Sequence, residues 1–213
     1  MLFLANPNNP TGTYLSAAEV ERLLRGLRPD ILFVLHSAYP GYVTADDYSV
    51  GIDLVDASEN VVMVRTFSKM GLGGARIGWM YGPAAIVDAV NRVRGPFNVS
   101  VLGQAAAIAA ARDTAFTAKL GEHNARWRGW LSESLSSNRI QVPPSQGNFI
   151  LALFPDVETA RQAFLALRAK GLLVREMHGY GIPQGLRISI GLEEAMRAVV
   201  EVLKDFGARG AID

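Results

Sequence analysis

Cysteine is absent from the 213-residue chain, which excludes a disulfide framework, a thiolate nucleophile and any zinc site built on sulfur. The 21 basic and 20 acidic residues leave a formal net charge of +1, and no run of five lysines or arginines occurs. The chain therefore lacks the basic patch that nucleic acids or anionic membrane surfaces attract. No apolar stretch approaches the roughly 20 residues that span a bilayer. We predict no nucleic-acid partner, no membrane segment, no metal and a cytoplasmic location.

The composition, 49% hydrophobic and 19% charged, is ordinary for a globular protein with a real core. Apolar runs of four to six residues alternate with longer segments of helical period, as in βα units around a mostly parallel sheet. In the first half, we expect strands at residues 2–5, 31–35, 61–65 and 76–81. Ser16 and Glu19 form the pattern of a helical capping box, and a further helix should begin at Pro83.

The second half indicates a smaller α+β unit. Two long helices are expected between residues 100 and 137, before the Pro143-Pro144 pair. After it we expect strands at 148–154, 172–175 and 186–190, helices at 157–170 and 193–206, and a frayed tail from 207 to 213. The predicted division is a large-domain part at 1–99, connecting helices at 100–137 and a small C-terminal domain at 138–213.

Two segments could carry chemistry. NPNNPTG, residues 6–12, stands between a predicted strand and a capped helix, and taken alone it is a turn. TFSKMGLGGAR, residues 66–76, places Lys69 after an apolar strand, beside hydroxyls and a glycine-rich turn. Such a lysine can be desolvated enough to act as a nucleophile or base; the alternative is a solvated loop lysine. The segment is not a dinucleotide fingerprint, because Arg76 stands where a third glycine is needed.

Five motifs in order carry a resemblance: NPNNPTG, the pair Ala38-Tyr39, TFSK with its glycine turn and arginine, SQGNFI, and LRISIG. Together they resemble the fold type I aminotransferases of class I/II, and within them the histidinol-phosphate aminotransferases, over essentially the whole chain. The resemblance implies an α/β fold, with part of the large-domain sheet of fold type I and a smaller C-terminal α+β domain. It also implies a homodimer, the cofactor pyridoxal 5′-phosphate (PLP), and amino transfer from L-histidinol phosphate to 2-oxoglutarate.

The resemblance also assigns roles to residues around the cofactor. Lys69 would be the catalytic residue, attaching the cofactor through its amine and later moving a proton. Asn9 and Tyr39 would hydrogen-bond the phenolate oxygen of PLP. The phosphate would be held by the hydroxyls of Thr66 and Ser68 and by the guanidinium of Arg76.

Three further residues are implied at the substrate end. Arg187, in LRISIG, would bind the substrate carboxylate or an equivalent anionic group, and Asn148 would support that end of the site. Arg175 is a candidate for the substrate phosphate. For Arg187 and Arg175 the alternative is a surface arginine on a strand.

The chain departs from the family pattern in three ways. His36 stands where the family carries an aspartate against the pyridine nitrogen, and the alternative for His36 is a packed strand histidine. The turn between Lys69 and Arg76 is one residue short, which can move the guanidinium by about 3 Å. The family's N-terminal part is also absent. Two alternatives therefore stand beside amino transfer: a non-catalytic homologue that self-associates and binds PLP weakly or not at all, and another PLP reaction such as racemisation or decarboxylation.

Overall fold

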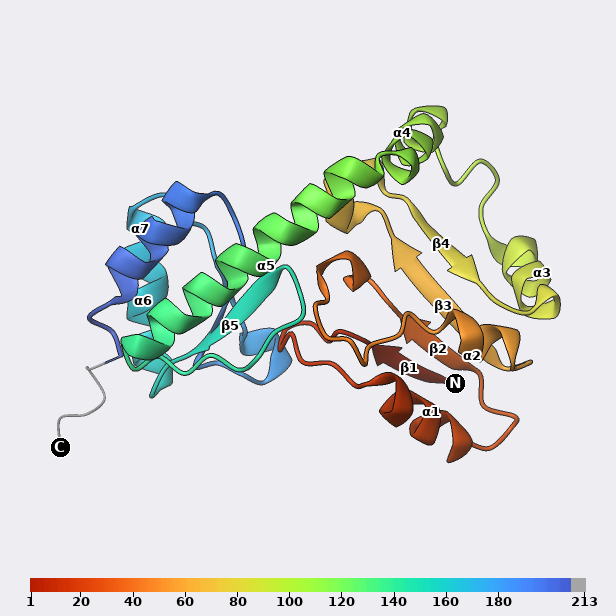
Figure 1. Cartoon of the computed structure of the whole chain (residues 1–213), viewed down its shortest axis with the longest axis horizontal. Coiled ribbons are helices and arrows are strands. Elements are labelled where there is room, and N and C mark those ends of the chain that lie inside the picture. Colours follow the sequence, from red (N-terminus) through yellow and green to blue (C-terminus); the bar gives the residue numbers. More distant parts are fainter. Residues whose placement is uncertain (208–213) are drawn as a thin grey trace. The chain divides into compact units, whose positions relative to one another are not determined.

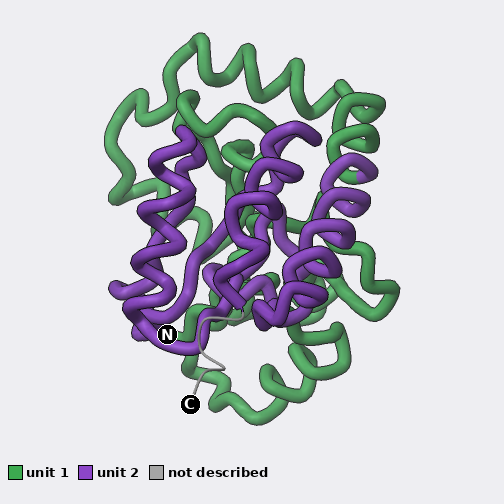
Figure 2. The backbone as a smooth tube through the Cα atoms, turned by 90° about the vertical axis from the view of Figure 1, so that its left-hand side faces the viewer, with its two compact units in different colours: residues 1–8, 14–121 green, residues 9–13, 122–213 purple. Residues whose placement is uncertain are grey.

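A computed structural model describes residues 1–207 and shows a mixed α/β fold (Figure 1). The chain forms two compact units, coloured separately in Figure 2. Unit 1 contains residues 1–8 and 14–121, and unit 2 contains residues 9–13 and the chain from 122 onward. The NPNNPTG segment is thus shared between the two units. The division of the chain into domains at residues 1–99, 100–137 and 138–213 stays a prediction.

Unit 1 is built on a four-stranded sheet in the order β1-β2-β3-β4. Its strands are β1 (Leu2–Ala5), β2 (Phe33–His36), β3 (Val61–Thr66) and β4 (Gly78–Tyr81). The first three strands are parallel, and β4 is antiparallel to β3. Because parallel strands end at the same edge, the residues that follow β2 and β3 meet there.

Two helices cover one face of this sheet. Helix α1 (Ala17–Arg25) begins with the predicted capping box: Glu19 N–H donates to Ser16 Oγ, and Ser16 N–H donates to Glu19 Oε2. Helix α2 (Ile52–Asp56), which the sequence did not predict, lies before β3. Alternate strand residues pack against both helices. The buried members of this core are Val20, Phe33, Leu35, Val55, Val61 and Met63.

The remaining elements of unit 1 are helical. Helices α3 (Ala84–Val93) and α4 (Val101–Arg112) lie in it, and α5 (Thr114–Ser137) begins in it and continues into unit 2. Short 3₁₀ turns η1 (Pro40–Tyr42), η2 (Ser68–Met70) and η3 (Gly73–Ala75) follow β2 and β3. The two long helices expected between residues 100 and 137 are confirmed.

Unit 2 has an antiparallel sheet in the order β5-β7-β6. Its elements are β5 (Phe149–Leu153), α6 (Val157–Ala169), β6 (Arg175–Glu176), η4 (His178–Tyr180), β7 (Gly185–Ser189) and α7 (Glu193–Leu203). Side chains of α5, α6 and α7 pack against one face of this sheet, where Ile150, Leu186 and Ile188 are buried. Residues on the other face alternate with these, so that Arg187 faces away from the core.

One predicted strand is wrong and several predicted boundaries differ from the structure; the strand expected from residue 31 begins at Phe33. The strand expected at 172–175 is wrong, because only Arg175 and Glu176 pair with β7, while Leu172 and Val174 pack against the core. The strand expected from 76 begins at Gly78. The last helix ends at Leu203 instead of 206. In the expected frayed tail, Gly207 is buried, and residues 208–213 lie outside the described residues.

Candidate active site

Lys69 lies in the turn η2, directly after the carboxyl end of β3. Its Nζ is 5.4 Å from the centroid of the Tyr39 ring, which follows the neighbouring strand β2 and is 5% exposed. The Tyr42 hydroxyl donates to the Lys69 carbonyl and so fixes the backbone of the turn. The structure therefore brings an amine and a buried phenol ring together at one edge of the unit 1 sheet.

Thr66 and Ser68 present a pair of hydroxyls beside this lysine. Their oxygens lie 2.9 Å apart, and the Ser68 N–H donates to Thr66 Oγ1 over 3.0 Å. Both side chains are partly exposed. Thr66 Oγ1 donates to Ser68 Oγ and lies 3.3 Å from the Ile77 carbonyl, so the Ser68 hydroxyl is the member of the pair whose proton can be given to a phosphate group.

The backbone of Arg76 is not in a strand conformation. Its φ of +54° lies in the left-handed region, which is uncommon for a residue other than glycine. Its Nη1 donates to the Gly73 carbonyl over 2.9 Å, and the side chain is exposed. The guanidinium therefore bonds back onto the shortened glycine turn.

His36 is the last residue of β2. Its pKa is lowered from the ordinary value of 6.5, first because the ring is partly desolvated and second because the Lys69 ammonium lies nearby. The imidazole is therefore neutral at pH 7, and it can donate or accept one hydrogen bond without carrying the negative charge of an aspartate.

A small cavity of about 80 Å³ lies at the same edge of unit 1. Its lining includes Tyr42, Thr66, Lys69 and Thr117. Space beside an amine and a hydroxyl is compatible with a small polar group, although it is too small to contain a whole cofactor.

Arg187 forms a second cluster, in unit 2. Its Nη1 donates to Asn9 Oδ1 over 2.6 Å, and its guanidinium carbon lies 5.2 Å from the centroid of the Phe149 ring. Its Nε is buried and has no hydrogen-bond partner within residues 1–207. Because buried donors are normally satisfied, this orphaned N–H fits an anion that binds at the guanidinium.

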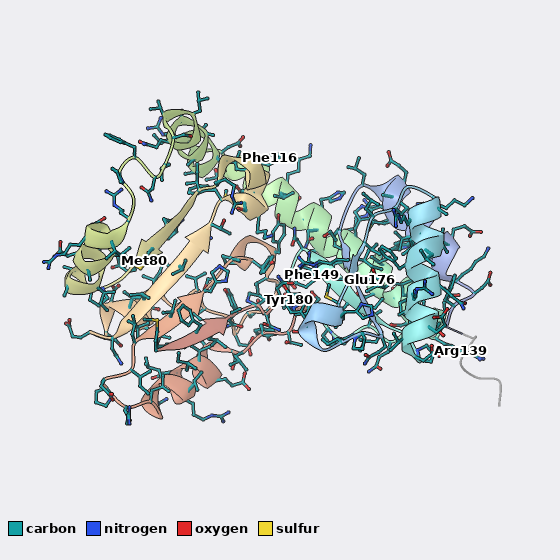
Figure 3. The ribbon with its side chains drawn as sticks, turned by 180° about the vertical axis from the view of Figure 1, so that it is seen from behind. Met80, Phe116, Arg139, Phe149, Glu176 and Tyr180 are labelled. Carbon is teal, nitrogen blue, oxygen red and sulfur yellow. The ribbon has the colours of Figure 1, made fainter. Side chains whose placement is uncertain are left out.

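Arg175 stands directly opposite Arg187 in the register of β6 and β7. Like charges at opposed positions repel, so an anion between the two arginines would relieve the repulsion. Arg175 is exposed and lies over Tyr180, with 5.6 Å from its guanidinium carbon to the ring centroid. Figure 3 labels the two aromatic residues concerned, Phe149 and Tyr180.

Asn148 and Asn6 show why a motif alone does not assign roles. The Asn148 carbonyl accepts from Ile190 N–H, and its side chain makes no hydrogen bond in the described part of the chain. Asn6, in contrast, is 1% exposed, and its side chain forms two 2.9 Å bonds with the Leu15 backbone. The turn interpretation of NPNNPTG therefore holds for Asn6, while Asn9 of the same motif binds Arg187.

Sequence reasoning did not identify Tyr42 or Phe149 as parts of these clusters. Only Phe149 had a local signal, its place in the SQGNFI motif. The predicted site residues divide between the units: His36, Tyr39, Thr66, Ser68, Lys69 and Arg76 lie in unit 1, and Asn9, Asn148, Arg175 and Arg187 lie in unit 2. The residues predicted to bind the cofactor thus lie in unit 1 except for Asn9, which lies in unit 2 with the residues predicted to bind the substrate.

Comparison with known proteins identifies the family of the chain. Residues 1–203 match the model of the family aminotransferase class I and II. The chain belongs to that family. The chain is 51% identical over 212 residues to the histidinol-phosphate aminotransferase of Nitrobacter winogradskyi. It is 52% identical over 211 residues to the histidinol-phosphate aminotransferase of Rhodospirillum rubrum. Each alignment covers 98% of this chain, but only 58% and 57% of the respective relative.

Solved structures agree with the aminotransferase fold. Histidinol-phosphate aminotransferase from Sinorhizobium meliloti, in complex with pyridoxal-5′-phosphate, is 28% identical with a TM-score of 0.88. The match covers 97% of this chain and 57% of that one. A putative histidinol-phosphate aminotransferase from Erwinia carotovora, 24% identical, has the same TM-score of 0.88 and is covered to 60%, with 99% of this chain aligned. The chain thus spans a little over half the length of the relatives that it matches.

Proposed function

We propose that the protein transfers amino groups with PLP, taking the amino group of L-histidinol phosphate and passing it to 2-oxoglutarate. The observation that carries the proposal is the position of Lys69, an amine at the carboxyl end of β3 beside Tyr39 and the hydroxyls of Thr66 and Ser68. This donor set fits PLP chemically, with an amine for its aldehyde and hydroxyls for its phosphate. When bound, PLP supplies an electron sink for the bond that breaks at the substrate carbon.

The residues of unit 1 would act before and during the proton transfer. Lys69 would hold the cofactor through its amine, and the same amine would carry a proton to and from the substrate carbon. The Tyr39 hydroxyl would donate to the phenolate oxygen of PLP. In unit 2, the Asn9 amide uses its Oδ1 to accept from Arg187, and its N–H donors are those that the family resemblance assigns to PLP. His36 would hydrogen-bond the pyridine nitrogen as a neutral imidazole.

The residues of unit 2 would select the substrate. Arg187 binds a carboxylate or phosphate, because its Nε is an unsatisfied donor and its guanidinium is held by Asn9 and by the Phe149 ring. Arg175, opposed to it in the sheet, adds a second positive charge. Two arginines suit the dianionic phosphate of L-histidinol phosphate better than a single carboxylate, and Asn148 would support the same end.

We further propose a cytoplasmic homodimer. Large apolar side chains of unit 1 are exposed from the end of α3 to the start of α4. Each of the following is at least 80% exposed: Val93, Phe97, Val101 and Leu102. Such patches are unusual on monomers. No helix in residues 1–207 is both long and apolar enough to cross a membrane.

A second candidate is a non-catalytic relative that self-associates and binds PLP weakly or not at all. Two observations favour it: His36 replaces an anionic partner, and Arg76 bonds to the Gly73 carbonyl.

Glutamate formation from L-histidinol phosphate, 2-oxoglutarate and added PLP separates the two candidates. Amino transfer predicts glutamate that disappears in Lys69→Met and persists in Lys119→Met, a matched change at an exposed lysine of α5. Absence of glutamate from the unmodified chain, together with weak PLP binding, would favour the second candidate.

A further inference from the structure

A buried arginine on α5 is not among the predicted site residues. Arg128 is 7% exposed, and its guanidinium donates to the Gly147 carbonyl over 3.0 Å and to Gln146 Oε1 over 3.4 Å. One helical turn earlier, Asn124 donates to the same Gly147 carbonyl over 3.2 Å. Taking an arginine out of water is costly. Two side chains of one helix therefore converge on a single carbonyl at substantial desolvation cost.

The turn that they hold is tightly built. Gly147 N–H donates to Ser145 Oγ over 3.1 Å, and Ser145 Oγ donates to the Phe149 carbonyl over 2.6 Å. A Cβ on Gly147 would come within 2.9 Å of the Phe149 ring. The position of this turn consequently fixes the position of the ring on which Arg187 lies.

The same turn also anchors the segment that contains Asn9. Gln146 N–H donates to the Gly12 carbonyl over 2.8 Å. A Cβ on Gly12 would come within 2.1 Å of Ser145 Oγ, so the two segments are in direct contact. Both supports of Arg187, the Phe149 ring and the Asn9 amide, thus depend on the turn at residues 145–148.

We propose that Arg128 is a positioning residue for the anion site: by holding the Gly147 carbonyl it sets Phe149 and Asn9, and through them the guanidinium of Arg187. The inference rests on the proposed function, in which Arg187 binds the anionic group of the substrate. The contacts that carry this role are the bonds from Arg128 to Gly147 and Gln146 in the turn.

The test follows the Nε–H signal of Arg187 by ¹H–¹⁵N NMR in the full chain without ligand, with Arg187→Met used to assign it. Arg128→Met should move this signal toward that of an exposed arginine. Arg128→Lys, which keeps the positive charge and the N–H donors of a single nitrogen, should shift the signal less. Arg126→Met, the same change at an exposed arginine of the same helix, should leave it in place. Titration with inorganic phosphate should show about tenfold weaker binding in Arg128→Met only.

A purely structural role predicts a lower melting temperature with the Arg187 signal and the phosphate affinity unchanged, and that result would overturn the proposal. If Arg128→Met does not fold, Asn124→Leu removes the other donor to the same carbonyl and should shift the signal in the same direction; an unchanged signal there overturns it equally. A different result would show that the proposed function is wrong. In that case the Arg187 signal of the unmodified chain responds to inorganic phosphate but not to L-histidinol phosphate.

Discussion

The guanidinium of Arg187 and the amide oxygen of Asn9 lie 2.6 Å apart although 178 positions separate them in the sequence. The bond joins the beginning of the chain to the last strand of the unit 2 sheet. It holds the arginine by one nitrogen and leaves Nε without a partner in the described structure.

Asn9→Ala should weaken binding of L-histidinol phosphate or inorganic phosphate about tenfold, since a hydrogen bond to a charged group contributes about 1.5–3 kcal/mol. Asn9→Asp should weaken it more, because the added carboxylate competes for Arg187. Calorimetric titration measures both affinities. Tighter binding in Asn9→Ala would mean that Asn9 blocks the guanidinium instead of orienting it.

The pKa of His36 should lie below 6.5 in the folded chain and should rise in Lys69→Met, because the nearby ammonium disfavours the imidazolium. Ring signals followed by NMR over pH 4–8 give this pKa directly. Lys119→Met is the control and should not change it. A His36 pKa above 6.5 would show that the ring is partnered by a negative charge.

The same depressed pKa predicts a direction for stability against pH. Below pH 6.5 the unfolded chain binds a proton at His36 more readily than the folded chain, so the free energy of unfolding falls as the pH drops through this range. His36→Gln should flatten that part of the profile measured by urea denaturation. A wild-type profile that rises toward lower pH would contradict the assignment.

Gly12→Ala should destabilise the protein by about 2 kcal/mol or more, through its positive φ of +77° and the collision with Ser145. Gly171→Ala is a matched control, since φ is +75° there but nothing lies within 4 Å of the added carbon. It should cost only the conformational strain, about 1–2 kcal/mol. If urea denaturation gives the same decrease in the free energy of unfolding for both variants, the contact between Gly12 and Ser145 does not contribute to stability.

Inserting one residue after Met70 should strengthen PLP binding about tenfold, or roughly 1.4 kcal/mol. The longer turn releases Arg76 from the Gly73 carbonyl so that its guanidinium can reach the phosphate. Fluorescence titration with PLP measures the gain, which Arg76→Met should abolish. A gain that survives Arg76→Met would have another origin.

Local signals were sufficient where neighbouring residues determine the structure. The capping box of Ser16 and Glu19 is complete within four positions, and its helix forms as predicted. The strand at 2–5 and the parallel sheet follow from short apolar runs. The strand expected at 172–175 fails because its apolar residues pack into the helical core while only Arg175 and Glu176 reach the sheet edge.

Contacts between distant segments could not be read from the sequence. Nothing near Asn9 or Arg187 indicates that they pair, and nothing near Arg128 indicates that it is buried against Gly147. The position of Lys69 directly after β3 was predictable because its motif is contiguous with that strand, whereas the placement of Tyr39 beside it depends on the pairing of β2 with β3.

Reductive trapping shows which lysine of the chain holds PLP, and the proposed function requires that it be Lys69. The purified chain is incubated with PLP at low molar excess, reduced with borohydride, digested, and the labelled lysine is identified by mass spectrometry. If Lys69 holds PLP, the label is concentrated on Lys69, and the visible absorbance seen before reduction is lost in Lys69→Met. A label spread at similar yield over Lys69, Lys119, Lys170 and Lys204 would contradict this assignment.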